Sequence, residues 1–362
     1  MMVNHFLQIR NGDTVDTLRE FLSAWWVQND IEAMLAPVEI PGEPAVNVRI
    51  IEGSAELRTV NPFAPIMLIN AAALVENFLR QHPGKRLAIV LRPCELRTLV
   101  ELRKRHRIPS WSQKDGNAEH QITVIGMDCP GTFPVGVFAE QVVSRGIDEL
   151  THQALEYGTR PGFVPHQLRS GCLVCDRPAP VGADMMIGAI GIAPHGFMLV
   201  IARDEETDAR LQLHAVTDSL ATEVQVVRRE TAVGALVELN AQNRRKLALA
   251  RSDDKDSLIG LFGLFARCSL CADCLDACPL YDGELTGMLG VDTPTSGSRP
   301  LLPELVSVSR WLASCSGCGM CQEACENDVS LTQLFAMISH QIRGELHYTA
   351  GDPFQNLPWV NG

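Results

Sequence analysis

The sequence predicts an α/β domain with a partly parallel sheet, followed by a mainly helical domain. Two apolar runs, 86–93 and 122–126, are bounded by charged residues, proline or glycine, which is typical of strands buried on both faces. A helical pattern begins at Leu96 and separates them, so strand, helix and strand alternate along the chain. From 258 onwards the pattern is mainly helical. A chain of 362 residues is long enough for two domains with separate cores.

Helices and strands of the α/β part can be predicted in chain order. Near the N-terminus, Asp13 can cap a helix whose apolar residues recur at helical spacing. A second helix is predicted over 69–81, because His82-Pro83-Gly84 is a strong stop signal. Further along, two strands are predicted at 183–192 and 197–202, on either side of a Pro-His-Gly turn. The α/β pattern therefore continues through the second of these strands.

The charged stretch 240–257 marks the predicted domain boundary, since it contains few β-branched residues. We therefore divide the chain into an N-terminal helical or extension segment, 1–60, an α/β domain, 61–245, and a mainly helical domain, 258–362. Within the last of these, 329–342 has a helical pattern of apolar residues.

Charge and hydropathy argue against several functional classes. The formal net charge of −12 disfavours nucleic-acid binding, which requires clustered positive surface. The N-terminus lacks a cationic segment followed by an apolar run, so no export signal is expected. The most apolar stretch, 64–75, is interrupted by Pro65 and Asn70 and is shorter than the roughly 20 residues of a membrane helix. We therefore expect a cytoplasmic protein with no transmembrane segment and no nucleic-acid partner.

The twelve cysteines are expected to be metal ligands, because the cytoplasm keeps thiols reduced and a domain of this size needs no disulfides. They fall into three groups of four, and none is left over. The first group is Cys268, Cys271, Cys274 and Cys278. The second group is Cys315, Cys318, Cys321 and Cys325. The third group is the scattered set Cys94, Cys129, Cys172 and Cys175.

Both C-terminal groups have the spacing C-x-x-C-x-x-C-x-x-x-C, which is typical of 4Fe-4S clusters. In two-cluster ferredoxins the fourth cysteine of each run usually binds the other cluster, so Cys278 and Cys325 can exchange sites. Structural zinc is the alternative, but zinc sites usually combine two separate C-x-x-C pairs. The sequence therefore predicts a helical, ferredoxin-like domain with two 4Fe-4S clusters.

The third group has a less regular spacing. Cys94 and Cys129 each come just after a predicted strand, at the edge where open α/β sheets place their ligands. Cys94 also lies at a predicted helix start, where free N–H groups favour a thiolate or an anionic cluster. The pair Cys172 and Cys175 can complete a third 4Fe-4S site. Zinc or inert buried thiols remain alternatives for this group.

Three motifs of the third group carry a family resemblance. They are R-P-C-E-L-R-T-L-V-E-L at 92–102, V-I-G-M-D-C-P-G-T at 124–132 and G-C-L-V-C at 171–175. In this order they resemble the beta subunits of the deazaflavin-reducing hydrogenases and formate dehydrogenases, over about 61–203. The resemblance implies a 4Fe-4S cluster on the four matching cysteines, with an FAD beside it. The family often has Gly-Asp where this sequence has Gly188-Ala189.

The C-terminal domain resembles the helical two-cluster domain of heterodisulfide reductase and succinate dehydrogenase electron-transfer subunits. Together the resemblances imply an electron-transfer subunit of an oxidoreductase complex, with substrate chemistry on a partner subunit of formate dehydrogenase, hydrogenase or heterodisulfide-reductase type. The alternatives are a stand-alone flavin-dependent reductase and an assembly module with structural metals. No sequence feature identifies catalytic residues, flavin-binding residues or a nicotinamide site.

Overall fold

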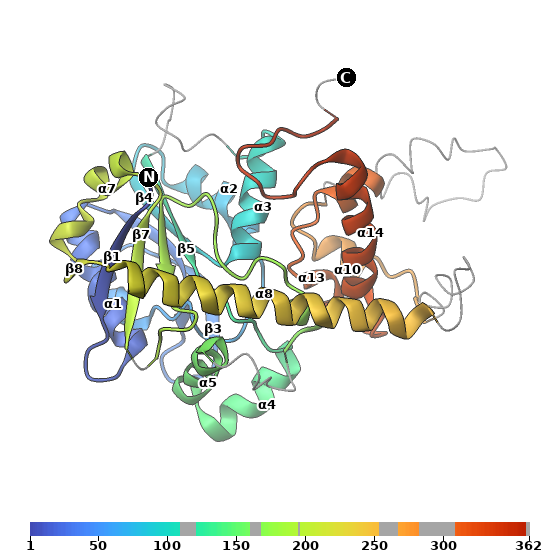
Figure 1. The fold of residues 1–362 in the computed structure, drawn as a ribbon, viewed down its shortest axis with the longest axis horizontal. Coiled ribbons are helices and arrows are strands. Elements are labelled where there is room, and N and C mark those ends of the chain that lie inside the picture. Colours follow the sequence, from blue (N-terminus) through green and yellow to red (C-terminus); the bar gives the residue numbers. More distant parts are fainter. Residues whose placement is uncertain (109–120, 160–167, 195, 253–266, 282–307, 360–362) are drawn as a thin grey trace.

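The computed structural model describes residues 1–108, 121–159, 168–194, 196–252, 267–281 and 308–359. Its largest part is an eight-stranded mixed sheet with helices packed around it (Figure 1). The strand order is β3-β2-β4-β5-β6-β7-β1-β8. This architecture confirms the predicted α/β class of the N-terminal part.

The centre of the sheet is parallel and its two margins are antiparallel. The parallel strands are β2 (Ala33–Glu39), β4 (Arg86–Leu91), β5 (Gln121–Met127) and β6 (Met185–Gly188). The antiparallel strands are β3 (Val46–Ile51) on one margin and β7 (Phe197–Ala202), β1 (Val3–Gln8) and β8 (Ser219–Leu220) on the other. The prediction of a partly parallel sheet is therefore confirmed.

Two features of the sheet differ from the sequence-based expectation. Segment 1–60, predicted to be helical or an extension, also contributes β1, β2 and β3 to the sheet. The strand predicted over 183–192 is shorter, because β6 ends at Gly188 and the chain then turns, with Ala193 N donating to Ala189 O at 3.0 Å. The central strands lie where their apolar runs placed them.

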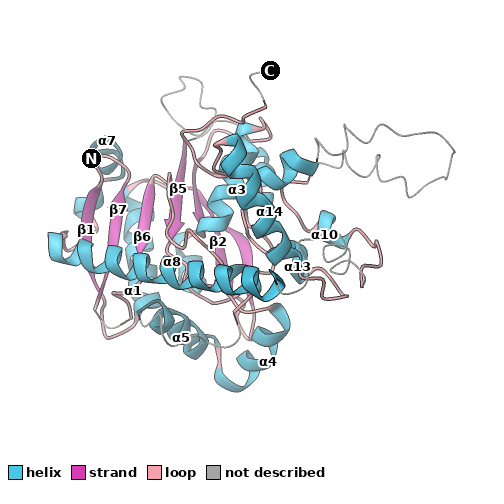
Figure 2. Cartoon of the chain, turned by 45° about the vertical axis from the view of Figure 1, so that its right-hand side comes forward, coloured by secondary structure: helices cyan, strands magenta, loops and turns pink. Residues whose placement is uncertain are grey.

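The helices cover both faces of the sheet (Figure 2). Helix α1 (Thr14–Gln28) packs its apolar residues on one face, and α2 (Ala72–Gln81) and α3 (Pro93–Lys104) pack on the other. The predicted cap of α1 is confirmed, since an Asp13 carboxylate oxygen accepts from Asp16 N at 2.9 Å. Every residue from Leu87 to Leu91 of β4 is buried, as expected for a strand with helices on both sides.

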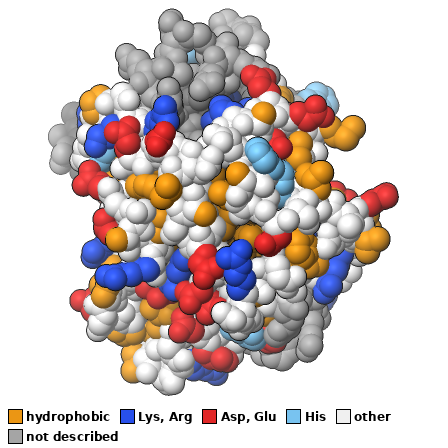
Figure 3. All heavy atoms as spheres, turned by 90° about the vertical axis from the view of Figure 1, so that its left-hand side faces the viewer, with side chains coloured by type: hydrophobic (Ala, Val, Ile, Leu, Met, Phe, Trp, Pro, Cys, Tyr) orange, Lys and Arg blue, Asp and Glu red, His pale blue; other side chains and the backbone are white. Residues whose placement is uncertain are grey.

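The remaining helices surround this core. They are η1 (Ser54–Thr59), α4 (Val135–Arg145), α5 (Ile147–Thr159), α6 (Ser170–Leu173), α7 (Glu205–Leu211) and η3 (Leu213–Ala215). On the face of the molecule drawn in Figure 3, acidic and basic side chains are interspersed among small apolar areas.

One long helix, α8 (Glu223–Ser252), runs from the sheet towards the C-terminal helices in both ribbon views. It crosses into the stretch 240–257, where we placed the domain boundary; the division itself stays a prediction. The C-terminal helices are α10 (Asp273–Asp276), α13 (Met320–Glu323) and α14 (Leu331–Leu346), the last close to the predicted helix at 329–342. Within the described ranges, every helix is too short or too polar to cross a lipid bilayer.

Candidate metal centre

The third cysteine group meets at the carboxyl edge of the parallel strands. Strand β4 is followed by α3, whose second residue is Cys94, and β5 is followed after one residue by Cys129. Because β4 and β5 are parallel neighbours, both thiols lie at the same edge. A single pocket is lined by Cys94, Cys129, Cys172 and Cys175. The structure thus brings together all four residues that the sequence grouped, while their role as iron ligands stays a prediction.

A buried ion pair holds the turn that carries Cys129. The carboxylate of Asp128 is 2% exposed and accepts from the backbone N–H groups of Ala189 and Ile190, at 2.9 and 3.1 Å. Arg229 of α8 donates to both of its oxygens, at 2.8 and 2.5 Å. Such a satisfied charge pair fixes the backbone because either partner alone would be a costly buried charge. Asp128 therefore ties the Cys129 turn to β6 and α8.

Helix α8 also holds the loop of the C-L-V-C pair. Three consecutive carbonyls of this loop, those of residues 173, 174 and 175, accept from side chains of α8. The donors are Asn243, Arg244 and Asn240, at 3.1, 2.6 and 2.9 Å respectively. On the other side, Thr132 N donates to the Cys172 sulfur at 3.4 Å. The pair is thus fixed by contacts from two distant parts of the chain.

The two C-terminal runs form the same local loop twice. In each run the residues two and four positions after the first cysteine have positive φ. In the first run these are Leu270 (φ 60°) and Ala272 (φ 71°), and in the second Gly317 (φ 71°) and Gly319 (φ 76°). Non-glycine residues in this conformation are strained, and such strain concentrates at functional sites. Alternating conformations of this kind turn successive N–H groups inwards and create concavities that accept anions and iron–sulfur clusters.

The neighbours of the fourth cysteines fit an exchange between the two runs. Burial raises the pKa of Cys278 to about 12, and the next cause is Cys318 of the other run. The Trp311 indole donates to the Cys278 sulfur at 3.3 Å. Burial also raises the pKa of Cys274, with smaller contributions from Cys268 and Cys271 and the smallest from Cys325. Each fourth cysteine thus lies near the first three of the opposite run.

The cysteines differ in exposure, and their spread is unlike a zinc site. Cys268 and Cys271 are exposed, and the other ten are intermediate. Tetrahedral zinc with bonds of about 2.3 Å requires sulfurs about 3.8 Å apart. Among the described residues, no three His, Cys, Asp or Glu side chains are gathered closely enough to share one ion.

Residues 84–226 match the family that covers the C terminus of the beta subunit of coenzyme F420 hydrogenase/dehydrogenase. This region contains the whole third cysteine group and Asp128, and Arg229 lies just beyond it. The chain belongs to this beta-subunit family. Both C-terminal cysteine runs lie outside the matched residues.

Two proteins of known assembly are similar to the chain. An F420-dependent formate dehydrogenase subunit beta from Methanocaldococcus jannaschii is 24% identical, over 78% of this chain and 77% of the relative. A protein chain in the structure of the F420-reducing [NiFe] hydrogenase complex from Methanosarcina barkeri aligns with a TM-score of 0.47 at 11% identity, over 71% of this chain and 94% of that chain.

The pocket of the family region suits a cationic cluster. Burial raises the pKa of Cys94 well above its usual value and that of Cys129 to about 12, and burial also raises the pKa of Cys172. The thiols oppose one another's ionisation as well, since Cys129 contributes to the raised pKa of Cys94. Iron ligation requires thiolates, so four buried thiols of this kind fit a group that supplies its own positive charge.

Sequence reasoning missed several residues at this family site. Cys318, assigned to the second run, also lines the pocket of the third group. The Asp128–Arg229 pair and the three α8 donors were missed as well, because their partners are distant in sequence. Asp128 did carry a signal, since a charged residue between a buried strand and a candidate ligand requires a partner.

Proposed function

We propose that this chain is an iron–sulfur electron-transfer subunit of an oxidoreductase complex, of the formate dehydrogenase beta type, with three 4Fe-4S clusters. The observation that carries the proposal is that Cys318 lines the pocket formed by the third cysteine group. Ligands of one C-terminal run thereby adjoin the site in the beta-subunit family region. A series of neighbouring cysteine sets is what an electron relay requires.

Three sites are defined by the cysteines that lie together. The outer site consists of Cys268, Cys271, Cys274 and Cys325. The middle site consists of Cys315, Cys318, Cys321 and Cys278. The inner site consists of Cys94, Cys129, Cys172 and Cys175. When bound, the clusters supply one-electron transfer between groups of tuned potential.

The exposure of the cysteines gives the proposed direction of contact with partners. The outer site has two exposed cysteines, Cys268 and Cys271, and the exposed Leu270 between them. A redox partner can therefore approach the outer site, while the inner site lies at the edge of the sheet. We propose a catalytic partner at the outer end, such as a formate dehydrogenase or hydrogenase subunit that carries the substrate chemistry.

An FAD beside the inner site is the second part of the proposal. It rests on the match of residues 84–226 to the beta-subunit family. The flavin, when bound, exchanges electrons in pairs or singly and can pass them to a soluble carrier. The relative from M. jannaschii is F420-dependent by name, so a deazaflavin coenzyme is the carrier to test first.

A heterodisulfide-reductase-like subunit is the alternative assembly. It is favoured by the two C-terminal runs, which lie outside the family match and are followed by the long helix α14. Isolation of the native complex with identification of its subunits distinguishes the two assemblies. A stand-alone flavin reductase predicts instead that the purified chain turns over an organic substrate without a partner.

Anaerobic iron and flavin analysis tests the proposal directly. Three clusters require about twelve irons per chain, and a single flavin site requires about one FAD. The variant Cys129→Ser should lose about four irons and leave the two C-terminal sites loaded. Zinc in place of iron, or an iron content that Cys129→Ser does not change, contradicts the three-cluster proposal.

A further inference from the structure

Arg97 lies between the middle and inner sites. It belongs to α3, which stands next to the C-terminal segment in both ribbon views, and only 6% of the residue is exposed. Its Nε donates to the carbonyl of Ser316, and one Nη donates to the carbonyl of Arg177, each at 3.0 Å. Ser316 directly follows a middle-site cysteine, and Arg177 is two residues after an inner-site cysteine. One guanidinium thus joins the backbones of both cysteine loops.

The surroundings of Arg97 fix it at this position. The adjacent Thr98 donates to the Ser316 hydroxyl at 2.9 Å, so two consecutive residues of α3 bind the same loop residue. The C-terminal segment covers the arginine on another side. A Cβ added at Gly351 would lie 2.4 Å from the Cβ of Arg97, and φ there is +75°. A glycine is therefore required where this segment crosses α3.

The charge of Arg97 acts on cysteines of both sites. Burial lowers its pKa, but Cys175 and Cys94 outweigh burial, and the pKa is raised overall. Arg97 is also one of the groups that act to lower the pKa of Cys315, against the larger effect of burial. The guanidinium is permanently charged, so it neither gives nor takes a proton during electron transfer.

We propose that Arg97 is a positioning residue shared by the two sites, which raises both of their reduction potentials and fixes the inner site against the middle site. The inference rests on the proposed function. A buried positive charge stabilises the more negative, reduced form of a nearby cluster, and charge and hydrogen bonding are established determinants of cluster potential. The rigid guanidinium fork donates to both loops at once, which a lysine ammonium on a flexible stem does less well.

Two substitutions separate the charge from the fork. Arg97→Gln removes the charge and keeps an amide donor, whereas Arg97→Lys keeps the charge and removes the fork. Redox titration of the holoprotein, monitored by EPR, should show the equilibrium constant for reduction lowered about tenfold at both sites in Arg97→Gln, which corresponds to about 59 mV for one electron. In Arg97→Lys the potentials should stay near those of the wild type, while the magnetic interaction between the reduced middle and inner clusters should weaken.

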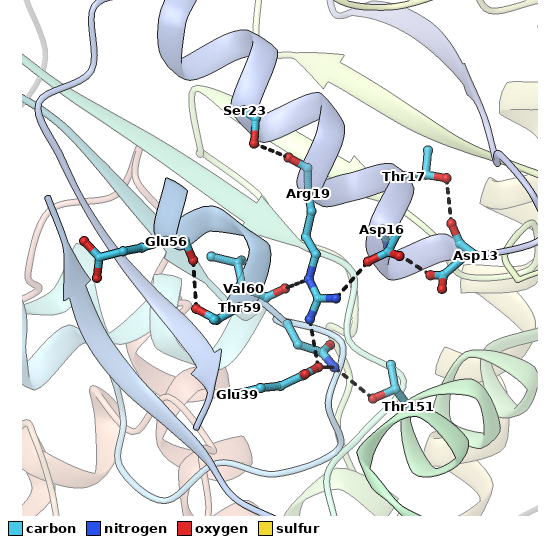
Figure 4. Close-up of polar contacts among 11 residues, drawn as sticks. Asp13, Asp16, Thr17, Arg19, Ser23, Glu39, Glu56, Thr59, Val60 and Thr151 are labelled. Carbon is cyan, nitrogen blue, oxygen red and sulfur yellow. Dashed lines mark hydrogen bonds and ion pairs between the residues drawn. The ribbon is translucent and has the colours of Figure 1, made fainter. Parts of the chain in front are cut away.

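Arg19 provides a matched control, because it also joins separate segments (Figure 4). It donates to Val60 O at 2.9 Å and pairs with Asp16 and Glu39 at 2.8 and 2.9 Å. Arg19→Gln should leave all potentials unchanged. Assignment of each potential comes from Cys129→Ser for the inner site and Cys315→Ser for the middle site, and the outer site should be unaffected throughout.

Each outcome bears on one proposal only. A wild-type protein without iron overturns the proposed function before Arg97 is tested. A wild-type iron content with unchanged inner and middle potentials in Arg97→Gln overturns the role of the charge. If Arg97→Gln does not assemble its clusters, Arg97→Lys decides, since wild-type magnetic interaction in that variant overturns the shared positioning role.

Discussion

The inner site and the two C-terminal sites solve the same ligation problem in opposite ways. The inner cysteines come from three separate segments, which a buried sheet and α8 bring to one pocket. The C-terminal cysteines lie in two short runs, each shaped by its own pair of positive-φ residues. The fold therefore prearranges the inner site, whereas the C-terminal loops depend more on the group they bind.

Core size supports this contrast. Both faces of the sheet are covered by continuous clusters of buried residues, which include Trp25 on one face and Phe78 on the other. The described C-terminal residues contribute few fully buried apolar side chains, among them Ala313 and Leu334. A small core rarely folds stably without disulfides or metals, so cluster binding should supply part of its folding free energy.

The largest expected effect is on the C-terminal part when iron is removed. Anaerobic chelation should expose 267–281 and 308–346 to protease and to amide hydrogen exchange, because the thiolates lose the charge that binds them together. The sheet should remain protected, since its core contains no ligand. Mass spectrometry of peptides from both parts measures the difference. Equal protection of the C-terminal part with and without iron would contradict the contrast.

The second effect concerns the fixed turn of the inner site. Asp128→Ala leaves the buried guanidinium of Arg229 without its partner, and the loss of one member of such a pair costs about 3–5 kcal/mol of unfolding free energy. Iron bound at the inner site should fall at the same time, while the C-terminal sites stay loaded. Chemical denaturation and iron analysis measure the two changes.

Asp16→Ala is the matched control for this prediction, because it breaks the pair with Arg19, in which 63% of the aspartate side chain is exposed. An exposed pair contributes only about 0–1 kcal/mol. If Asp128→Ala behaved like this control, the proposed role of the buried pair at the inner site would be wrong.

The same contrast explains what could be predicted from the sequence. The short runs are local, so their spacing and positions were readable directly. Cys94 and Cys129 could be placed together because neighbouring parallel strands bring their carboxyl ends to one edge. Strand β1 could not be placed, since its partner Ala202 lies almost 200 residues from Val3 and only tertiary pairing makes that segment a strand. Cys318 at the inner pocket was missed for the same reason, because packing between distant segments leaves no local pattern.

A smaller effect distinguishes the two C-terminal runs from each other. Gly319→Ala in the second run introduces a side chain where φ is 76°, and the left-handed conformation costs a non-glycine residue about 1–2 kcal/mol. Ala272→Gly at the matching position of the first run should have the opposite sign and a smaller size, because glycine also gains entropy in the unfolded chain. The temperature at which each iron-loaded variant loses its clusters measures both. Changes of the same sign would show that the two loops are not equivalent.

The smallest expected effect is on a single hydrogen bond to sulfur. Trp311 donates to the Cys278 sulfur at 3.3 Å, and hydrogen bonds to cluster sulfurs raise the reduction potential. Trp311→Phe keeps the edge-on ring packing against Phe335 but removes the donor. The middle-site potential should therefore fall by less than in Arg97→Gln, where a full buried charge is lost. Because the indole lies on the C-terminal side, the inner-site potential should not change. A shift confined to the outer site would instead assign Cys278 to its own run and end the proposed exchange of fourth cysteines.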